Sequence, residues 1–89
     1  METPLAVVSV DGIDRDRFSR IQAAAAQQLG EPLAGDTGTI NHSGVKVDYA
    51  YAGSTLTLNV MAVPHFLGHP VISATAVQLR LLNWVYSVT

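Results

Sequence analysis

Two runs of alternating residues, 45–52 and 55–62, flank the dipeptide Gly53-Ser54, and this pattern constrains the fold more than any other feature. Strict alternation is typical of a strand with one buried face, and Gly-Ser is the composition of a two-residue type II′ turn. With that turn, the apolar residues of both runs share one face and the polar residues share the other. The predicted cross-strand pairs are Tyr51 with Leu56, Tyr49 with Leu58, Val47 with Val60, and Asp48 with Asn59. A slip of one residue would turn every side chain to the opposite face, so the pattern predicts one register.

The first thirty residues predict a strand followed by a helix. Residues 5–10 are apolar and β-branched and end at a turn signal, which is typical of a strand. A helix follows, capped by Asp11 or Asp14 and running to about Leu29, with Gly30 just beyond its end. One narrow face of this helix is apolar and consists of Phe18, Ile21, Ala25 and Leu29.

Another hairpin precedes the second alternating pair. Residues 37–41 pair with the run that starts at Val45, either through a two-residue turn at Ser43-Gly44 or through a longer loop. Both alternatives place Ile40 on the apolar face, and the sequence does not choose between them.

The last quarter of the chain predicts a loop and a long helix. Pro64 ends the preceding strand because proline has no backbone donor. Residues 64–69 are then a loop, and Pro70 suits the first turn of a helix over residues 71–88. In this interpretation His69 lies at the N-cap of the helix.

Together these elements predict an α+β fold in a single domain of residues 1–89, with the order β-α-β-β-β-α. The three consecutive strands form an antiparallel meander, and the N-terminal strand joins the same sheet, most simply at an edge. Both helices pack on one face of the sheet, where they cover its apolar side.

Composition and charge exclude several classes of protein. The 89 residues contain no cysteine, which excludes disulfides and thiolate metal sites. Five Lys and Arg residues and a net charge of −2 argue against nucleic-acid binding. A membrane span is disfavoured because Gln78, Arg80 and Asn83 would lie near the middle of the last helix. With no targeting segment visible, we expect a soluble cytoplasmic protein that needs no cofactor.

The distribution of charge points to self-association. Of the twelve charged residues, all except Arg80 lie within positions 1–48. The last helix is apolar over most of its circumference, and such a surface is typical of a protein interface. We therefore predict a homodimer, the commonest closed arrangement, with an interface at Val77, Leu81, Trp84 and Val88. The alternative is a monomer in which the first helix covers the remaining side of the last one.

A small-molecule site is the second hypothesis. Tyr49 and Tyr51 fall on the apolar face, where each hydroxyl needs a partner or an opening to water. This predicts a pocket for a small apolar ligand between sheet and helices, lined by Tyr49, Tyr51, Leu58 and Phe66.

The third hypothesis is a metal protein or enzyme built on histidines. His65 and His69 are four residues apart, a spacing that puts both imidazoles on one face of a continuous helix. Pro64, Gly68 and Pro70 make this stretch a loop, so that geometric reason is lost. His42 lies in a different segment.

One tripeptide resembles a catalytic motif. Residues 36–38 are Asp-Thr-Gly, which resembles the active-site motif of retroviral-type aspartic proteases, enzymes that are dimers of chains of similar length. The segment Gly68-His69-Pro70 lacks the residues that such a protease needs before its last helix. We interpret Asp36 as a loop residue that caps its own turn. The leading hypothesis is a non-enzymatic interaction or accessory protein.

Overall fold

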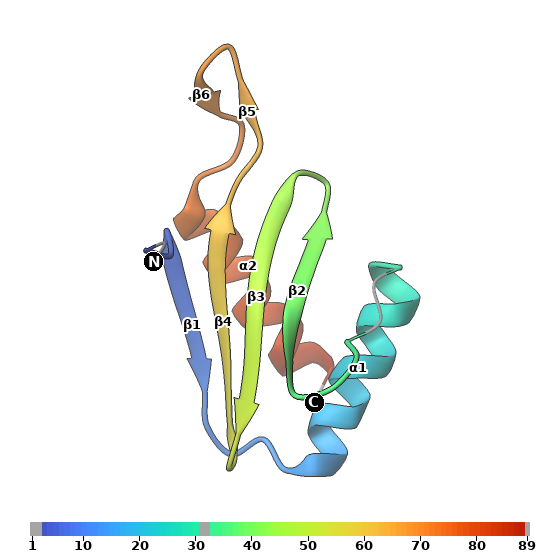
Figure 1. Ribbon diagram of the computed structural model, residues 1–89. Helices are drawn as coiled ribbons and strands as arrows, with labels where there is room; N and C mark the ends of the chain where they lie inside the picture. Colours follow the sequence, from blue (N-terminus) through green and yellow to red (C-terminus); the bar gives the residue numbers. More distant parts are fainter. Residues whose placement is uncertain (1–2, 31–32, 89) are drawn as a thin grey trace.

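A computed structural model describes residues 3–30 and 33–88, which form a four-stranded antiparallel sheet, a small hairpin and two helices (Figure 1). The strands of the sheet stand in the order β1-β4-β3-β2. Along the chain the elements are β1 (Ala6–Val10), α1 (Arg15–Gln28), β2 (Thr37–His42), β3 (Val45–Ala52), β4 (Thr55–Ala62), β5 (His65–Phe66), β6 (His69–Pro70) and α2 (Ala74–Val88). The predicted α+β fold, with a meander and an N-terminal strand at the sheet edge, is confirmed.

The pairing of β3 with β4 follows the predicted register. The observed pairs include Tyr51 with Leu56, Tyr49 with Leu58, Val47 with Val60, and Asp48 with Asn59. Gly53 has a φ of 62°, which the first central position of a type II′ turn requires. The alternation of apolar and polar residues therefore becomes a sheet with one buried face.

The first hairpin uses the shorter of its two predicted connections. β2 ends at His42, opposite Val45, so that Ser43 and Gly44 alone form the turn. Their φ values of 52° and 81° are those of a type I′ turn, whose twist matches that of the paired strands. Ile40 is buried, and the apolar face thus extends onto the edge strand β2.

The helix α1 begins and ends where its capping residues predict. Asp14 is the N-cap, and its carboxylate accepts a hydrogen bond from the backbone N–H of Arg17 at 2.8 Å. At the other end the N–H of Leu29 donates to the carbonyl of Ala25, and Gly30 follows with a φ of 68°. The fully buried residues are Phe18, Ile21 and Ala25, the predicted apolar face.

The predicted loop before the last helix is instead a short hairpin, β5–β6, which projects beyond the sheet (Figure 1). His65 lies opposite Pro70, and the chain reverses at Leu67 and Gly68, which have φ values of 54° and 81°. Strands of two residues carry no periodicity, and proline is tolerated in a strand only at such an edge. The sequence therefore did not predict this hairpin, and Pro70 was instead interpreted as the start of a helix.

The start of α2 also differs from the prediction. The helix begins at Ala74, so residues 71–73 precede it. The hydroxyl of Ser73 accepts a hydrogen bond from the backbone N–H of Ala76 at 3.1 Å, as an N-cap side chain does. His69, the predicted N-cap, lies in β6 instead.

Both helices cover the same face of the sheet, and the other face is open. Buried residues of α1 and α2 form one core with the apolar face of the strands. In Figure 1, α2 runs behind the sheet, where it packs on β1 and β4. On the open face the hydroxyl of Thr39 donates to the carboxylate of Asp48 at 2.7 Å and joins β2 to β3. This sidedness follows directly from the register.

A stack of two aromatic rings attaches α1 to the sheet. The ring of Phe18 lies on that of Tyr51, with 4.3 Å between centroids and 9° between planes. The Tyr51 hydroxyl donates to the carbonyl of Ile13 at 2.6 Å. The Arg15 guanidinium lies 4.9 Å from the centre of the Tyr51 ring and binds the Asp36 carboxylate. One cluster thus joins α1, β3 and the segment before β2.

We expect Phe18→Ala to lower the free energy of unfolding by about 3–5 kcal/mol, because it removes a fully buried ring and its stacking contact with Tyr51. Urea unfolding followed by circular dichroism measures this loss. Phe18→Leu, which keeps most of the apolar volume, is the control and should lose clearly less. A loss below about 1 kcal/mol for Phe18→Ala would show that the stack does not anchor the helix.

Candidate binding surfaces

The four residues predicted as a dimer interface face the sheet. Val77 is only 6% exposed and belongs to the core. Leu81, Trp84 and Val88 are half-buried and pack against the core as well. Val77 is thus committed to the core, whereas Leu81, Trp84 and Val88 hold α2 on the sheet and keep part of their surface exposed.

The outward surface of α2 carries a different apolar stripe, formed by Leu79, Leu82 and Tyr86. Leu79 and Tyr86 are 56% and 63% exposed, and Leu82 is half-buried between them, with part of its side chain packed against the core. Spacings of three and four residues place all three on one side of the helix. We call these three residues the outer stripe.

Within the described ranges no helix, α2 included, is long and apolar enough to cross a membrane.

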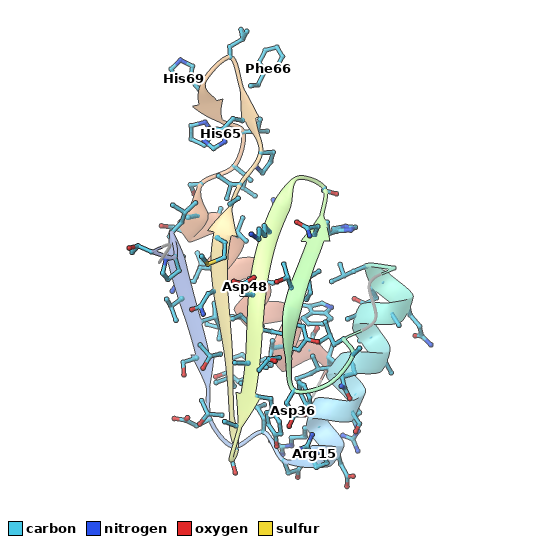
Figure 2. All side chains as sticks on the ribbon, viewed as in Figure 1. Arg15, Asp36, Asp48, His65, Phe66 and His69 are labelled. Carbon is cyan, nitrogen blue, oxygen red and sulfur yellow. The ribbon has the colours of Figure 1, made fainter. Side chains whose placement is uncertain are left out.

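The four residues predicted for a ligand pocket are not brought together. Tyr49, Tyr51 and Leu58 are buried in the core, whereas Phe66 is 70% exposed on the β5–β6 hairpin (Figure 2). The Tyr49 hydroxyl donates to the carbonyl of Ala34 at 3.1 Å, so it needs no ligand as partner. Burial raises the pKa of Tyr49 above its usual value. These tyrosines complete the core and its hydrogen bonds.

An apolar cleft of about 430 Å³ lies elsewhere, between α2 and the β2–β3 hairpin. Ile40, Val45 and Val47 contribute its lining from the hairpin. From the helical side and the segment before it, the lining residues are Ile72, Val77, Leu81 and Trp84, and Leu29 joins them from the end of α1. The volume is within the range of small-molecule sites in proteins.

Polar groups in the lining of this cleft are few and carry no negative charge. They are His42, Ser43 and Arg80, all of them exposed. No carboxylate belongs to the described lining, and in the described parts of the chain no acidic group is within ion-pair distance of Arg80. Within the described residues, the cleft therefore combines apolar walls with one positive charge that has no acidic partner.

A hydrogen bond between the helices sets the position of the largest side chain in the cleft. The indole Nε1 of Trp84 donates to the side-chain oxygen of Gln28 at 2.7 Å. Since Gln28 is the last residue of α1, this bond joins the end of α1 to α2. The polar edge of the indole is satisfied there, and its ring is available to the cleft.

The histidines do not gather into a metal centre. His65 and His69 are exposed on the β5–β6 hairpin, and His42 ends β2. Among residues 3–30 and 33–88, no group of three or more histidine, cysteine or acidic side chains is close enough to hold a metal ion. The two hairpin histidines thus have no further ligand from the described part of this chain.

The tip of the β5–β6 hairpin is apolar and strained. Phe66 and Leu67 are 70% and 83% exposed, and Figure 2 shows Phe66 at the far end of the molecule. Leu67 has a φ of 54°, a left-handed conformation that costs a residue with a Cβ about 1–2 kcal/mol. An exposed leucine in that conformation contributes little to the stability of the fold.

Asp36 binds across the fold and does not cap its own turn, so the interpretation from sequence was wrong. Its two carboxylate oxygens accept hydrogen bonds from Arg15 at 2.7 and 3.3 Å. This hydrogen bonding holds the pKa of Asp36 below its usual range. Figure 2 shows the pair beside the start of α1. The Asp-Thr-Gly carboxylate is therefore engaged in a structural ion pair.

Comparison with known proteins gives no significant match to a family model, to a curated protein or to a solved structure. The evidence on function is thus the side-chain geometry.

We expect Asp36→Asn to lower the stability slightly at neutral pH and to have no effect in strong acid. The pKa of Asp36 is lower in the folded chain than in the unfolded chain, so the ion pair stabilises the fold above the unfolded value. This contribution is lost as the pH falls through the folded pKa. Urea unfolding at pH 7 and near pH 2 measures the difference, and 1 M salt should reduce it because the pair is exposed. An equal difference at both pH values would contradict this account.

We expect Leu67→Asn to raise the free energy of unfolding by up to about 1 kcal/mol, because asparagine tolerates the left-handed conformation. Gly68→Ala is the comparison variant and should destabilise the protein, since Gly68 has a φ of 81°. Thermal and urea unfolding measure both. Destabilisation by Leu67→Asn would mean that the leucine side chain contributes to the fold.

Proposed function

We propose that this protein is a non-enzymatic interaction protein that forms a homodimer through the outward surface of α2. The observation that carries the proposal is the outer stripe, in which the described residues leave Leu79 and Tyr86 exposed and Leu82 half-buried. Large apolar side chains gathered on one surface favour a protein contact. The helix remains the predicted dimer element, but a different side of it is used.

The geometry of the stripe suits a two-fold contact. From Leu79 to Tyr86 the stripe spans two turns of helix, about 10 Å at 1.5 Å per residue. Leu82 lies near its middle, so an antiparallel second copy would place Leu79 of one chain beside Tyr86 of the other. An isologous dimer requires this kind of self-complementary surface.

Charge also favours pairing on this side. Arg80 is the single charged residue of α2, and it belongs to the cleft lining rather than to the outer stripe. A dimer on the outer stripe would therefore avoid burying this charge, and burying a charge without a partner costs several kcal/mol.

The stripe alone is smaller than a stable interface, which buries about 800 Å² per partner. Further apolar surface lies beyond the N-terminal end of α2. There Val71 is 66% exposed, and the β5–β6 hairpin presents Phe66 and Leu67. Of the seven large hydrophobic residues exposed in the described ranges, five lie between Phe66 and Tyr86. This surface would extend a contact along the helix axis.

We expect Tyr86→Glu to weaken the dimer by about thirtyfold or more, because a charge would enter the apolar contact with Leu79 of the second copy (about 2 kcal/mol). Ser87→Glu is the matched control: it adds the same charge one residue further on, but outside the stripe. Sedimentation velocity over a range of concentrations of the untagged protein measures the effect, and circular dichroism verifies that both variants fold.

The wild type should sediment at twice the chain mass, as should Ser87→Glu, while Tyr86→Glu shifts to the monomer. A wild type that stays monomeric at all concentrations would overturn the proposal. Equal weakening by both variants would place the contact elsewhere on the chain.

A further inference from the structure

We propose that the cleft between α2 and the β2–β3 hairpin binds an amphipathic monocarboxylate, with its apolar part against Trp84 and Val47 and its carboxylate on Arg80. This inference is independent of the dimer, because the cleft and the outer stripe are on opposite sides of α2. The helix turns about 100° per residue, which puts Trp84 roughly 160° from Tyr86 around the axis.

The cleft exists because the two helices leave part of the apolar face uncovered. α2 packs on β1 and β4, and α1 is attached by Phe18 to Tyr51 near the opposite end of β3. Near the Ser43-Gly44 turn, the half-buried Val45 and the buried Val47 enter the cleft lining. An apolar ligand would cover the apolar surface that lines the cleft.

The walls are suited to a hydrocarbon chain or ring. The lining from the hairpin is β-branched, and the lining from α2 ends in the indole of Trp84. Each methylene that such walls remove from water raises the affinity about fourfold. Affinity should therefore increase steadily with chain length until the cleft is full.

The charge at the cleft selects an anion. The whole chain has a net charge of −2, yet the described cleft lining contains a guanidinium, a histidine and a serine and no carboxylate. A guanidinium presents two parallel donors that match the two oxygens of a carboxylate. Arg80 has no acidic partner among the described residues, and one cation neutralises one negative charge, which favours a monocarboxylate over a phosphate monoester carrying nearly two.

The protein contains its own reporter for this site. Trp84 is the single tryptophan of the sequence, and its ring belongs to the cleft lining. Its indole N–H is engaged with Gln28, so occupation of the cleft changes the surroundings of the ring without removing a hydrogen bond. The tryptophan fluorescence of the protein therefore comes from Trp84 alone and reports on the cleft.

The test is a Trp84 fluorescence titration with hexanoate, octanoate and decanoate below their micelle concentrations, and with decanol as the uncharged analogue of decanoate. Arg80→Gln removes the proposed anchor, and Arg20→Gln is the matched control because it removes the same charge from an exposed position on α1. Both positions are exposed, so both variants should fold, which circular dichroism verifies.

We expect affinity to rise about fourfold per methylene from hexanoate to decanoate. Arg80→Gln should weaken decanoate binding about tenfold to a hundredfold and leave decanol unchanged, as loss of a charge-assisted hydrogen bond predicts. Arg20→Gln should match the wild type.

Three results would overturn the inference: no change in Trp84 fluorescence up to millimolar decanoate, affinity independent of chain length, or an equal loss of decanoate and decanol in Arg80→Gln. Decanoate binding to Phe66→Ser but not to the wild type would also overturn the inference. In that case Phe66 of a second copy, on its β5–β6 hairpin, would be the natural occupant of the cleft. Sedimentation velocity of the same samples measures the oligomeric state, so ligand binding and dimer formation are tested independently.

Discussion

One face of the sheet is continuously apolar and buried, and this sidedness decides where the other elements lie. The register of β3 with β4 puts Tyr51 opposite Leu56 and Val47 opposite Val60, while Asp48 and Asn59 share the other side. A face built in this way must be covered, so both helices pack on it. The opposite face is mixed: it carries the Thr39–Asp48 hydrogen bond, and it also exposes Val7, which lies opposite Asn59.

Two short helices cannot cover a four-stranded sheet completely, and the candidate cleft is the part they leave. α1 is held at one end of the sheet by Phe18 on Tyr51, and α2 follows β1 and β4. The bond between Trp84 and Gln28 joins the helices where α1 ends, so neither can move over the β2–β3 turn without breaking it. The cleft is thus a consequence of how the core is closed.

Local signals predicted the features that local physics controls: the Gly53 turn, the strand register, and the helix ends at Asp14 and Gly30. The β5–β6 hairpin was not predictable, because its strands are too short for periodicity and Leu67 stands where asparagine or glycine is usual. The hydrophobic pattern also could not predict which side of α2 packs on the sheet, because apolar residues nearly encircle the helix. The cleft brings together three segments distant in sequence, and no single one of them carries a motif.

α2 separates two surfaces of different chemistry, and the position of one residue makes both possible. Arg80 is the only charge after Asp48 in the sequence, and it follows Leu79 by about 100° around the helix. On the outer stripe it would have to be desolvated in any dimer, whereas beside the cleft it is exposed to water. Whatever binds the folded chain alone also stabilises it by mass action. For a chain of 89 residues, whose core is necessarily thin, a partner on one side of α2 and a ligand on the other would each add stability without competing for the same side chains.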